Sequence, residues 1–189
     1  MDIKMNRWTL QTIVIVAMLS VGFVSCGKDD DDDNGQKSET ISDNDPEGTI
    51  IANLTNTFKE GFNGYYDNGI DNMNGGLWCY LGMNSSNNLQ VANRRSNVDS
   101  YSVDIVSVGK VSGLSAIKDI PETGWSKQAA AIPGYGYIYR TKHYVSNGPF
   151  SSEGQYEYAR IFAIDYMTNT FGGIMGITIK YQEKWNPNQ

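Results

Sequence analysis

Residues after about position 48 follow a pattern of short apolar runs and polar turns that predicts strands. Apolar and polar positions alternate one by one, and Gly, Asn, Ser and Pro separate the runs. The predicted strands cover residues 49–54, 76–83, 88–92, 100–108, 128–132, 134–142, 155–166 and 173–182. A short helical turn fits residues 54–62. We expect a single all-β domain of mainly antiparallel strands, built as an SH3-like small barrel with extra strands or as a two-sheet sandwich.

The last two predicted strands, 155–166 and 173–182, form the clearest unit of the chain. Residues 167–170 supply the turn between them, so the pattern predicts a long antiparallel hairpin. Both faces of strand 155–166 carry apolar side chains, such as Ile161 and Phe162, which is typical of a strand covered on two sides. Glycines follow the turn at Gly172, Gly173 and Gly176. They predict a bulge or the close approach of a neighbouring strand.

A row of tyrosines shares one face of strand 134–142, at Tyr135, Tyr137 and Tyr139. An exposed row would stack on sugar rings, whereas a buried row would be ordinary cross-strand packing. Gly134 and Gly136 leave the opposite face too small to fill a core, so packing is the favoured interpretation. The three tyrosines are still the candidate ligand-stacking residues. A similar row lies on strand 155–166, at Tyr156, Tyr158 and Phe162.

The first 25 residues have the pattern of a removable leader. Lys4 and Arg7 give a positive start, and residues 13–24 are mostly apolar. A run of about 20 apolar residues is needed to cross a bilayer, so the shorter run here favours a signal peptide over a transmembrane helix. Phe23-Val24-Ser25-Cys26 resembles the lipobox of a bacterial lipoprotein, which implies that Cys26 is the acylated first residue after cleavage. The alternative is a plain secretory leader that is cleaved elsewhere.

Residues 26–47 are predicted to be a disordered acidic tether, and the domain is expected at 48–189. Lys28-Asp29-Asp30 resembles the export signal that sends Bacteroidota lipoproteins to the outer face of the outer membrane. The alternative is a soluble spacer, since the aspartates at 29–33 repel one another and keep the tether extended. Residues 29–47 contain almost nothing apolar, so burial cannot offset the entropy of ordering them.

The acidic character of the chain belongs to this tether and not to the domain. The whole chain has a formal net charge of −6 and a pI near 4.7. From Gly48 onward the acidic and basic residues balance, eleven against eleven. The domain therefore offers no net field to a polyanion, and we expect no nucleic-acid partner.

Reactive side chains are scarce in the domain. His143 is the single histidine, so zinc sites and Ser-His-Asp arrangements lack their parts. Cys79 has no disulfide partner once Cys26 is acylated, and its alternation with Leu77 and Leu81 predicts a small buried hydrophobe. The chain has no glycine-rich phosphate motif, and we expect no cofactor.

Carboxylates are the remaining candidates for chemistry, because a glycosidase needs only two of them at a suitable separation. The candidates are Asp67, Asp71, Asp104, Glu157 and Asp165. Ordinary solvated or ion-paired acids are the favoured interpretation. Asp67 and Asp71 are also a weak candidate site for Ca²⁺, although Gly69 and Trp78 depart from the EF-hand pattern. A plain Asn/Gly loop is favoured for residues 67–75.

Several segments together resemble a domain found in uncharacterised lipoproteins of gut Bacteroidota. They are residues 83–88, 108–114, 120–125, 133–137, 158–161 and 172–182. The resemblance implies habitat and architecture, and it carries over no catalytic residue. We expect a lipid-anchored, surface-exposed outer-membrane protein that binds a glycan or an envelope protein. A carboxylate-dependent glycan hydrolase and a structural accessory of an envelope complex are the alternatives, so the sequence leaves enzymatic activity open.

Overall fold

A computed structural model describes residues 39–56, 69–72, 76–93, 101–147 and 150–188, with side chains described except at 71–72, 76–78, 101, 143–147 and 150–153. These residues belong to one compact unit, Asn34–Gln189. The predicted disordered tether at 26–47 is therefore wrong at its end, where Lys180 Nζ lies 2.6 Å from Asp45 and Gln182 donates to the carbonyl of Glu47 at 2.9 Å. The predicted leader and the predicted Cys26, Lys28, Asp29 and Asp30 positions lie outside the described residues. The predicted helical turn at 54–62 is wrong at its start, because Leu54 and Thr55 end a strand; residues 57–62 are outside the description.

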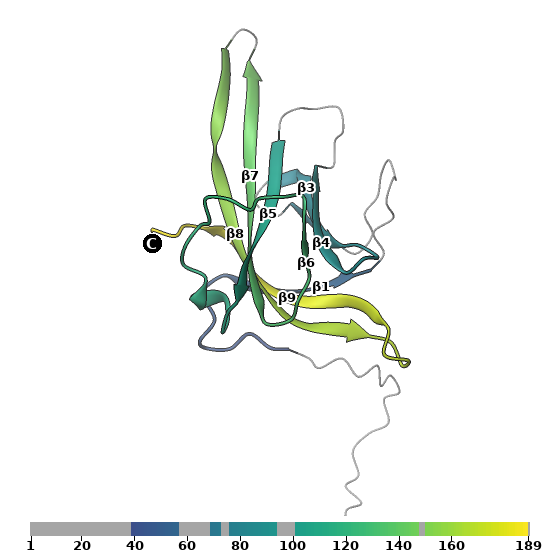
Figure 1. Cartoon of the computed structure of the whole chain (residues 1–189). Coiled ribbons are helices and arrows are strands. Elements are labelled where there is room, and N and C mark those ends of the chain that lie inside the picture. The colour runs from purple at the N-terminus through teal and green to yellow at the C-terminus, as the bar shows by residue number, and fades with distance from the viewer. Residues whose placement is uncertain (1–38, 57–68, 73–75, 94–100, 148–149, 189) are drawn as a thin grey trace, which may run out of the picture. The chain divides into compact units, whose positions relative to one another are not determined.

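The larger of two sheets has five antiparallel strands. They are β1 (Thr49–Thr55), β5 (Tyr101–Lys110), β7 (Tyr135–Asn147), β8 (Phe150–Thr168) and β9 (Ile174–Trp185). Their order is β1-β9-β8-β7-β5, so β8 is the middle strand, and the long strands β7 and β8 run side by side (Figure 1). The predicted hairpin at the centre of the fold is confirmed, and both of its strands are longer than predicted.

The smaller sheet has four strands in the order β2-β3-β4-β6. They are β2 (Ile70–Asn72), β3 (Gly76–Met83), β4 (Asn88–Asn93) and β6 (Gln128–Ala130). The all-β fold is confirmed, and two sheets around one core make it sandwich-like. The interpretation of residues 67–75 as a plain loop is wrong at β2, which pairs with β3 although its neighbours are rich in Asn and Gly.

The main core lies between the two sheets. The smaller sheet contributes residues such as Leu81 and Leu89, and the larger contributes Ile161 and Ile179, all fully buried. Cys79 belongs to the same core, which confirms its prediction as a buried hydrophobe, and burial raises the pKa of its thiol. The larger sheet therefore packs one of its faces against the smaller sheet.

A second cluster covers the opposite, outer face of the larger sheet. Residues 111–125 cross this face, with a 3₁₀ turn, η1 (Leu114–Ala116), that buries Leu114 against Ile117 and Ile138. Gly136 makes room for them, since a Cβ there would lie 2.8 Å from Ile117 Cδ1. The glycine face of β7 is thus filled from the covering segment. β8 is consequently covered on both faces, as its two apolar faces predict.

One glycine of the hairpin allows the close strand approach that was predicted, and another has a role in the turn. Gly172 has a φ of 78° in the turn, where the Asn169 side chain accepts hydrogen bonds from the amides of Phe171 and Gly173. At Gly176 a Cβ would lie 2.3 Å from the carbonyl oxygen of Leu54 in β1. The absence of a side chain at Gly176 therefore allows β1 to pair closely with β9.

Candidate functional site

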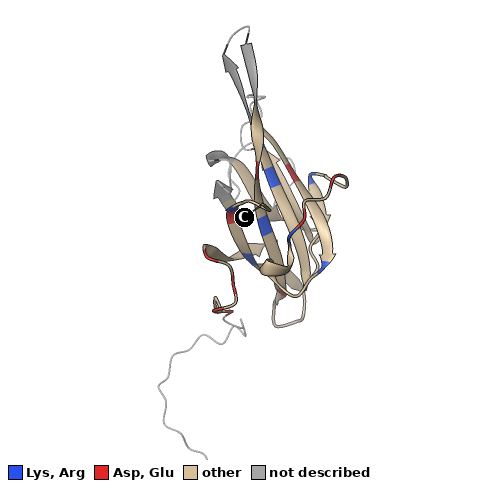
Figure 2. Cartoon of the chain, turned by 90° about the vertical axis from the view of Figure 1, so that its left-hand side faces the viewer, with Lys and Arg blue, Asp and Glu red and all other residues tan. Residues whose placement is uncertain are grey.

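The candidate site lies on the outer face of the five-stranded sheet. In the middle of β7 and β8, odd-numbered residues such as Tyr139 and Ile161 point to the core, so Arg140, Tyr158 and Arg160 point outward. Basic residues recur on the strands of this sheet (Figure 2). The register sets Asp104, Arg140, Tyr158 and Trp185 in one row across four strands. Strand alternation thus gathers aromatic and charged side chains on one surface.

Arg140 is the centre of the first part of this surface. Its guanidinium carbon lies 3.9 Å from the ring centroid of Trp125 and 4.4 Å from that of Tyr156, within the range of cation–π attraction. Its Nε and Nη2 both donate to Asp104 Oδ2 at 3.2 Å. The Trp125 indole donates in turn to the carbonyl of Pro121 at 3.0 Å. Arg140 is therefore held by one carboxylate and two aromatic rings of its own protein.

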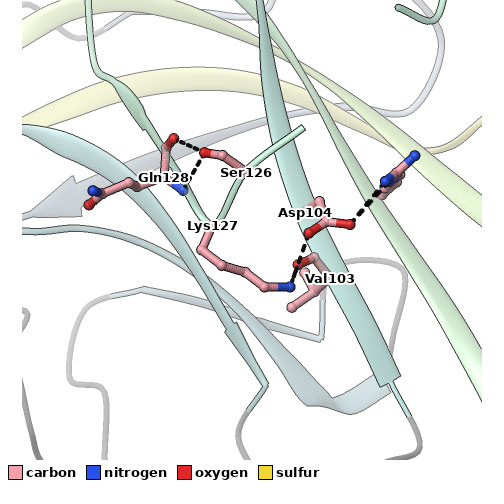
Figure 3. A network of polar contacts seen from close by, with 6 residues as sticks. Val103, Asp104, Ser126, Lys127 and Gln128 are labelled. Atoms are coloured by element: carbon pink, nitrogen blue, oxygen red, sulfur yellow. Dashed lines mark hydrogen bonds and ion pairs between the residues drawn. The ribbon is translucent and has the colours of Figure 1, made fainter. Parts of the chain in front are cut away.

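Asp104 has both of its oxygens occupied. Lys127 Nζ is 3.0 Å from Oδ1 and also donates to the carbonyl of Val103, and Figure 3 shows the lysine reaching from the neighbouring segment to both groups. The adjoining Ser126 and Gln128 bond to one another in the same view. With two cations on one carboxylate, Asp104 has the environment of a structural ion pair.

The structure does not bring together the candidate carboxylates whose side chains it describes. Glu157 pairs with Thr141, whose side chain is buried, so Glu157 is on the opposite face from Asp104. Asp165 lies eight positions further along β8, about 26 Å away at about 3.3 Å per residue. A glycosidase needs a separation of about 5 to 10 Å. Asp104, Glu157 and Asp165 therefore do not form a hydrolytic pair with one another.

The side chains of both proposed Ca²⁺ ligands lie outside the part of the chain that the structure describes. Asp67 is not among the described residues, and Asp71 lies in β2 with its backbone alone described. Within the part of the chain that the structure describes, no group of three or more His, Cys, Asp or Glu side chains is placed to hold a metal. His143 pairs with Tyr101 through the backbone of β7. The calcium site stays a prediction.

The candidate ligand-stacking role of Tyr135, Tyr137 and Tyr139 is wrong for two of them. Tyr137 and Tyr139 are fully buried between the sheets, and Tyr135 is half-buried against the same core. The packing interpretation is therefore confirmed. Tyr137 Oη donates to the carbonyl of Ala130 at 2.6 Å and accepts from the amide of Ile132 at 2.8 Å, and burial raises the pKa of Tyr137 to about 12.

Trp185 reaches the outer face because β9 contains a bulge. Ile177, Ile179 and Tyr181 face the core, and strict alternation would send Trp185 there too. Instead, two residues of β9, 183 and 184, lie opposite the single residue Ala159 of β8 between the pairs Arg160–Gln182 and Tyr158–Trp185. Lys184 takes a left-handed φ of 50° within this bulge. The extra residue turns Trp185 outward, where it joins the second cluster and is 8% exposed.

Two adjoining depressions share residues 184–187 as a common wall. The Arg160 depression has a volume of about 410 Å³ and is lined by Ser115, Ile117, Lys118, Arg160, Gln182 and residues 184–187. The Tyr158 depression has a volume of about 440 Å³ and is lined by Ile120, residues 155–158 and residues 184–188. The first is rich in cations and amides, and the second contains tyrosine rings.

Arg160 is fixed at the edge of its depression by neutral groups. Its Nε donates to Gln182 Oε1 at 2.7 Å, and its Nη1 donates to the carbonyl of Ile117 at 3.0 Å. Its guanidinium carbon lies 5.4 Å from the Trp185 ring centroid. Burial lowers the pKa of Arg160, because desolvation disfavours the charged form. A positive charge is thus held at a fixed place beside an open depression.

The sequence contained a partial signal for this site. The row of Tyr156 and Tyr158 was visible in the alternation of strand 155–166, and Arg160 continues it. Trp185 was missed because it follows the predicted strand end and is turned by the bulge. Lys118 comes from the covering segment, whose path over the sheet has no periodic pattern.

Comparison with models of protein families, with curated proteins and with solved structures gives no match to this chain. In the portion of the chain with described residues, no helix is long and apolar enough to cross a membrane. The resemblance to gut Bacteroidota lipoproteins therefore stays a prediction.

Proposed function

We propose that this protein is a lipid-anchored binding module on the outer surface of the bacterial outer membrane. Cys26, in its lipobox-like setting, supports the anchor. Lys28-Asp29-Asp30 supports export to the cell surface, and the resemblance to Bacteroidota lipoproteins supports the same location. The ligand that we propose is a glycan, bound in the two depressions around Trp185.

The single observation that carries the binding function is the adjoining pair of depressions. The Tyr158 depression exposes parts of Tyr156 and Tyr158, whose ring centroids are 6.2 Å apart. The Arg160 depression adds the amides of Gln182 and Asn186. Aromatic surface with a few convergent hydrogen-bonding groups suits a sugar, which has apolar ring faces and many hydroxyls. Asp104, Glu157 and Asp165, by comparison, form no pair with one another for the alternative of glycan hydrolysis.

A binding assay with the purified full chain tests this function. Tyr156→Ala should weaken binding of the recognised oligosaccharide about tenfold, because ring stacking contributes about 0.5 to 1.5 kcal/mol beyond the area that it buries. Phe171→Ala is the matched control, since Phe171 is an aromatic residue 95% exposed at the β8–β9 turn and lines neither depression. Equal affinities for the Tyr156→Ala and Phe171→Ala variants would contradict the assignment.

A second candidate function is attachment to another envelope protein. The observation that favours it is the exposed apolar surface at the β8–β9 turn, where Phe171 is 95% and Met175 is 51% exposed. Exposed apolar surface of this kind is often covered by a partner. The same two variants separate the functions, because protein attachment would be lost with Phe171→Ala and kept with Tyr156→Ala.

The anchor is tested by Cys26→Ala. The variant should lose acylation and be released from membranes, because several acyl chains, each stabilising by about 0.8 kcal/mol per buried CH₂, give lasting attachment. Alanines at Lys28, Asp29 and Asp30 are the matched control, since that variant should stay acylated but become inaccessible to protease added to whole cells. Membrane retention and gel mobility of Cys26→Ala that equal those of the parent chain would contradict the anchor.

A further inference from the structure

Most of the described charges on the outer face of the larger sheet are neutralised by a neighbour. Asp104 bridges Arg140 at 3.2 Å and Lys127 at 3.0 Å. On β9, Lys180 Nζ lies 2.6 Å from Asp45, and both side chains are largely shielded from solvent. These cations have their counter-ions within the chain, so they have little attraction left for a ligand.

Arg160 is different from these cations. It lies on the middle strand, half-buried, and none of the described carboxylates pairs with it. Its partners are the neutral oxygens of Gln182 and Ile117 and the face of Trp185, and its Nη2 makes no hydrogen bond to a described residue. A half-buried charge without a counter-ion is costly, which gives it a strong attraction for an external anion.

The lining of the Arg160 depression contains further basic residues and no acidic ones. Lys118 and Lys184 join Arg160 there, and no Asp or Glu is part of the lining. Ser115 and Asn186 add further hydrogen-bond donors. The depression, at about 410 Å³, is within the range of small-ligand sites. Arg160 and Lys118 thus line one open space that no Asp or Glu lines, although the domain as a whole is electrically balanced.

We propose that the Arg160 depression binds the anionic group of an acidic sugar, a carboxylate or a sulfate ester. Arg160 supplies the fixed counter-ion, and Lys118 supplies a second charge from the covering segment. This inference rests on the proposed glycan-binding function and names the chemical class of its ligand. A lowered pKa at Arg160 agrees with it, since a bound anion would replace the solvation that burial removes.

The neighbouring Tyr158 depression extends the inference to the next sugar. It shares residues 184–187 with the Arg160 depression but presents the rings of Tyr156 and Tyr158. An acidic unit at Arg160 would therefore be followed by a unit that stacks on tyrosine. The two depressions together select a glycan chain of at least two units, of which one is charged.

Matched acidic and neutral probes test this inference on the purified full chain. Oligogalacturonate and its fully methyl-esterified form differ in the carboxylate charge, and a sulfated galactan oligosaccharide and its desulfated, neutral form differ in the sulfate. At least one acidic probe should bind about tenfold or more tightly than its neutral partner. Added salt should weaken the tighter complex, because the depression is open to solvent.

The Lys118→Glu variant tests whether the preference for the acidic probe arises in the Arg160 depression. Lys118 is exposed, so the variant should fold, and it should reduce affinity for the acidic probe about tenfold, a larger loss than for the neutral probe. Lys110→Glu is the matched control, because Lys110 is exposed at the end of β5 and lines neither depression. Arg160→Lys keeps the charge and should retain more affinity for the acidic probe than Arg160→Gln.

The outcomes distinguish this inference from the proposed function. Tyr156-dependent binding of acidic and neutral probes with equal affinity would overturn the anion site and leave glycan binding standing. An acidic preference that Lys110→Glu reduces as much as Lys118→Glu would also overturn the site, since it would reflect overall charge. If none of the four probes binds, both the anion site and glycan binding fail.

Discussion

Replacing Ile161 by alanine should lower the free energy of unfolding by about 2 to 5 kcal/mol. Ile161 is fully buried in the middle of β8, where it pairs with Tyr137 on one side and Tyr181 on the other. The neighbouring strands β7 and β9 cannot shift to fill a cavity at this place, because each of them is also paired with another strand, β5 or β1. The loss is a large fraction of the about 5 to 15 kcal/mol that stabilises a typical domain.

Chemical denaturation of the purified chain measures this loss. Ile50→Ala is the matched control, because Ile50 is the same residue type on edge strand β1 and is 41% exposed. Its cost should stay below that of Ile161→Ala, near about 1 kcal/mol. Similar costs at the two positions would place β8 outside the core and contradict the sheet order.

The free energy of unfolding should fall at alkaline pH, because the buried phenol of Tyr137 then loses its proton. The pKa of this buried phenol is raised to about 12 in the folded chain, from about 10 in the unfolded one. The folded chain therefore holds the proton more tightly, and its stabilisation is complete below about pH 10 and lost as the pH rises through about 12. The two-unit difference corresponds to about 3 kcal/mol.

Tyr137→Phe should flatten this alkaline decline, and unfolding measured from neutral pH to pH 12 tests it. At neutral pH the variant should be less stable by about 1 to 3 kcal/mol, since the Ala130 carbonyl and the Ile132 amide lose their partner. Tyr139 and Tyr181, whose pKa values burial also raises, keep part of the decline. A variant whose stability falls as steeply as that of the parent chain would show that Tyr137 does not cause the decline.

Alternation predicted the strands well because each of the main strands faces the core with every second residue. β3 and β8, for example, occur where the pattern placed them. β2 was missed since its pairing with β3 is a tertiary contact that three residues cannot encode. The path of residues 111–125 was also missed, because it follows the shape of the sheet surface and not a local period.

The candidate site was only partly predictable, because alternation separates two faces without saying what covers each. Tyr137 and Tyr156 both belong to aromatic rows, yet the first is fully buried and the second lines a depression. The total charge of the domain likewise does not show how individual charges are paired. A balance of eleven acids and eleven bases excludes a net field, but it does not show that Arg160 is separated from every described carboxylate.

The bulge in β9 acts as a change of parity in the chain. From Ile177 to Tyr181, before the bulge, the odd-numbered residues face the core; after it, the odd-numbered Trp185 faces outward. A one-residue deletion between 182 and 185 would restore the earlier parity and exchange the surroundings of Trp185 and its neighbours. Extensions after Asn188 would leave the parity untouched. The number of residues between Gln182 and Trp185 is therefore constrained, so the wall shared by both depressions depends on a count of residues as well as on their identity.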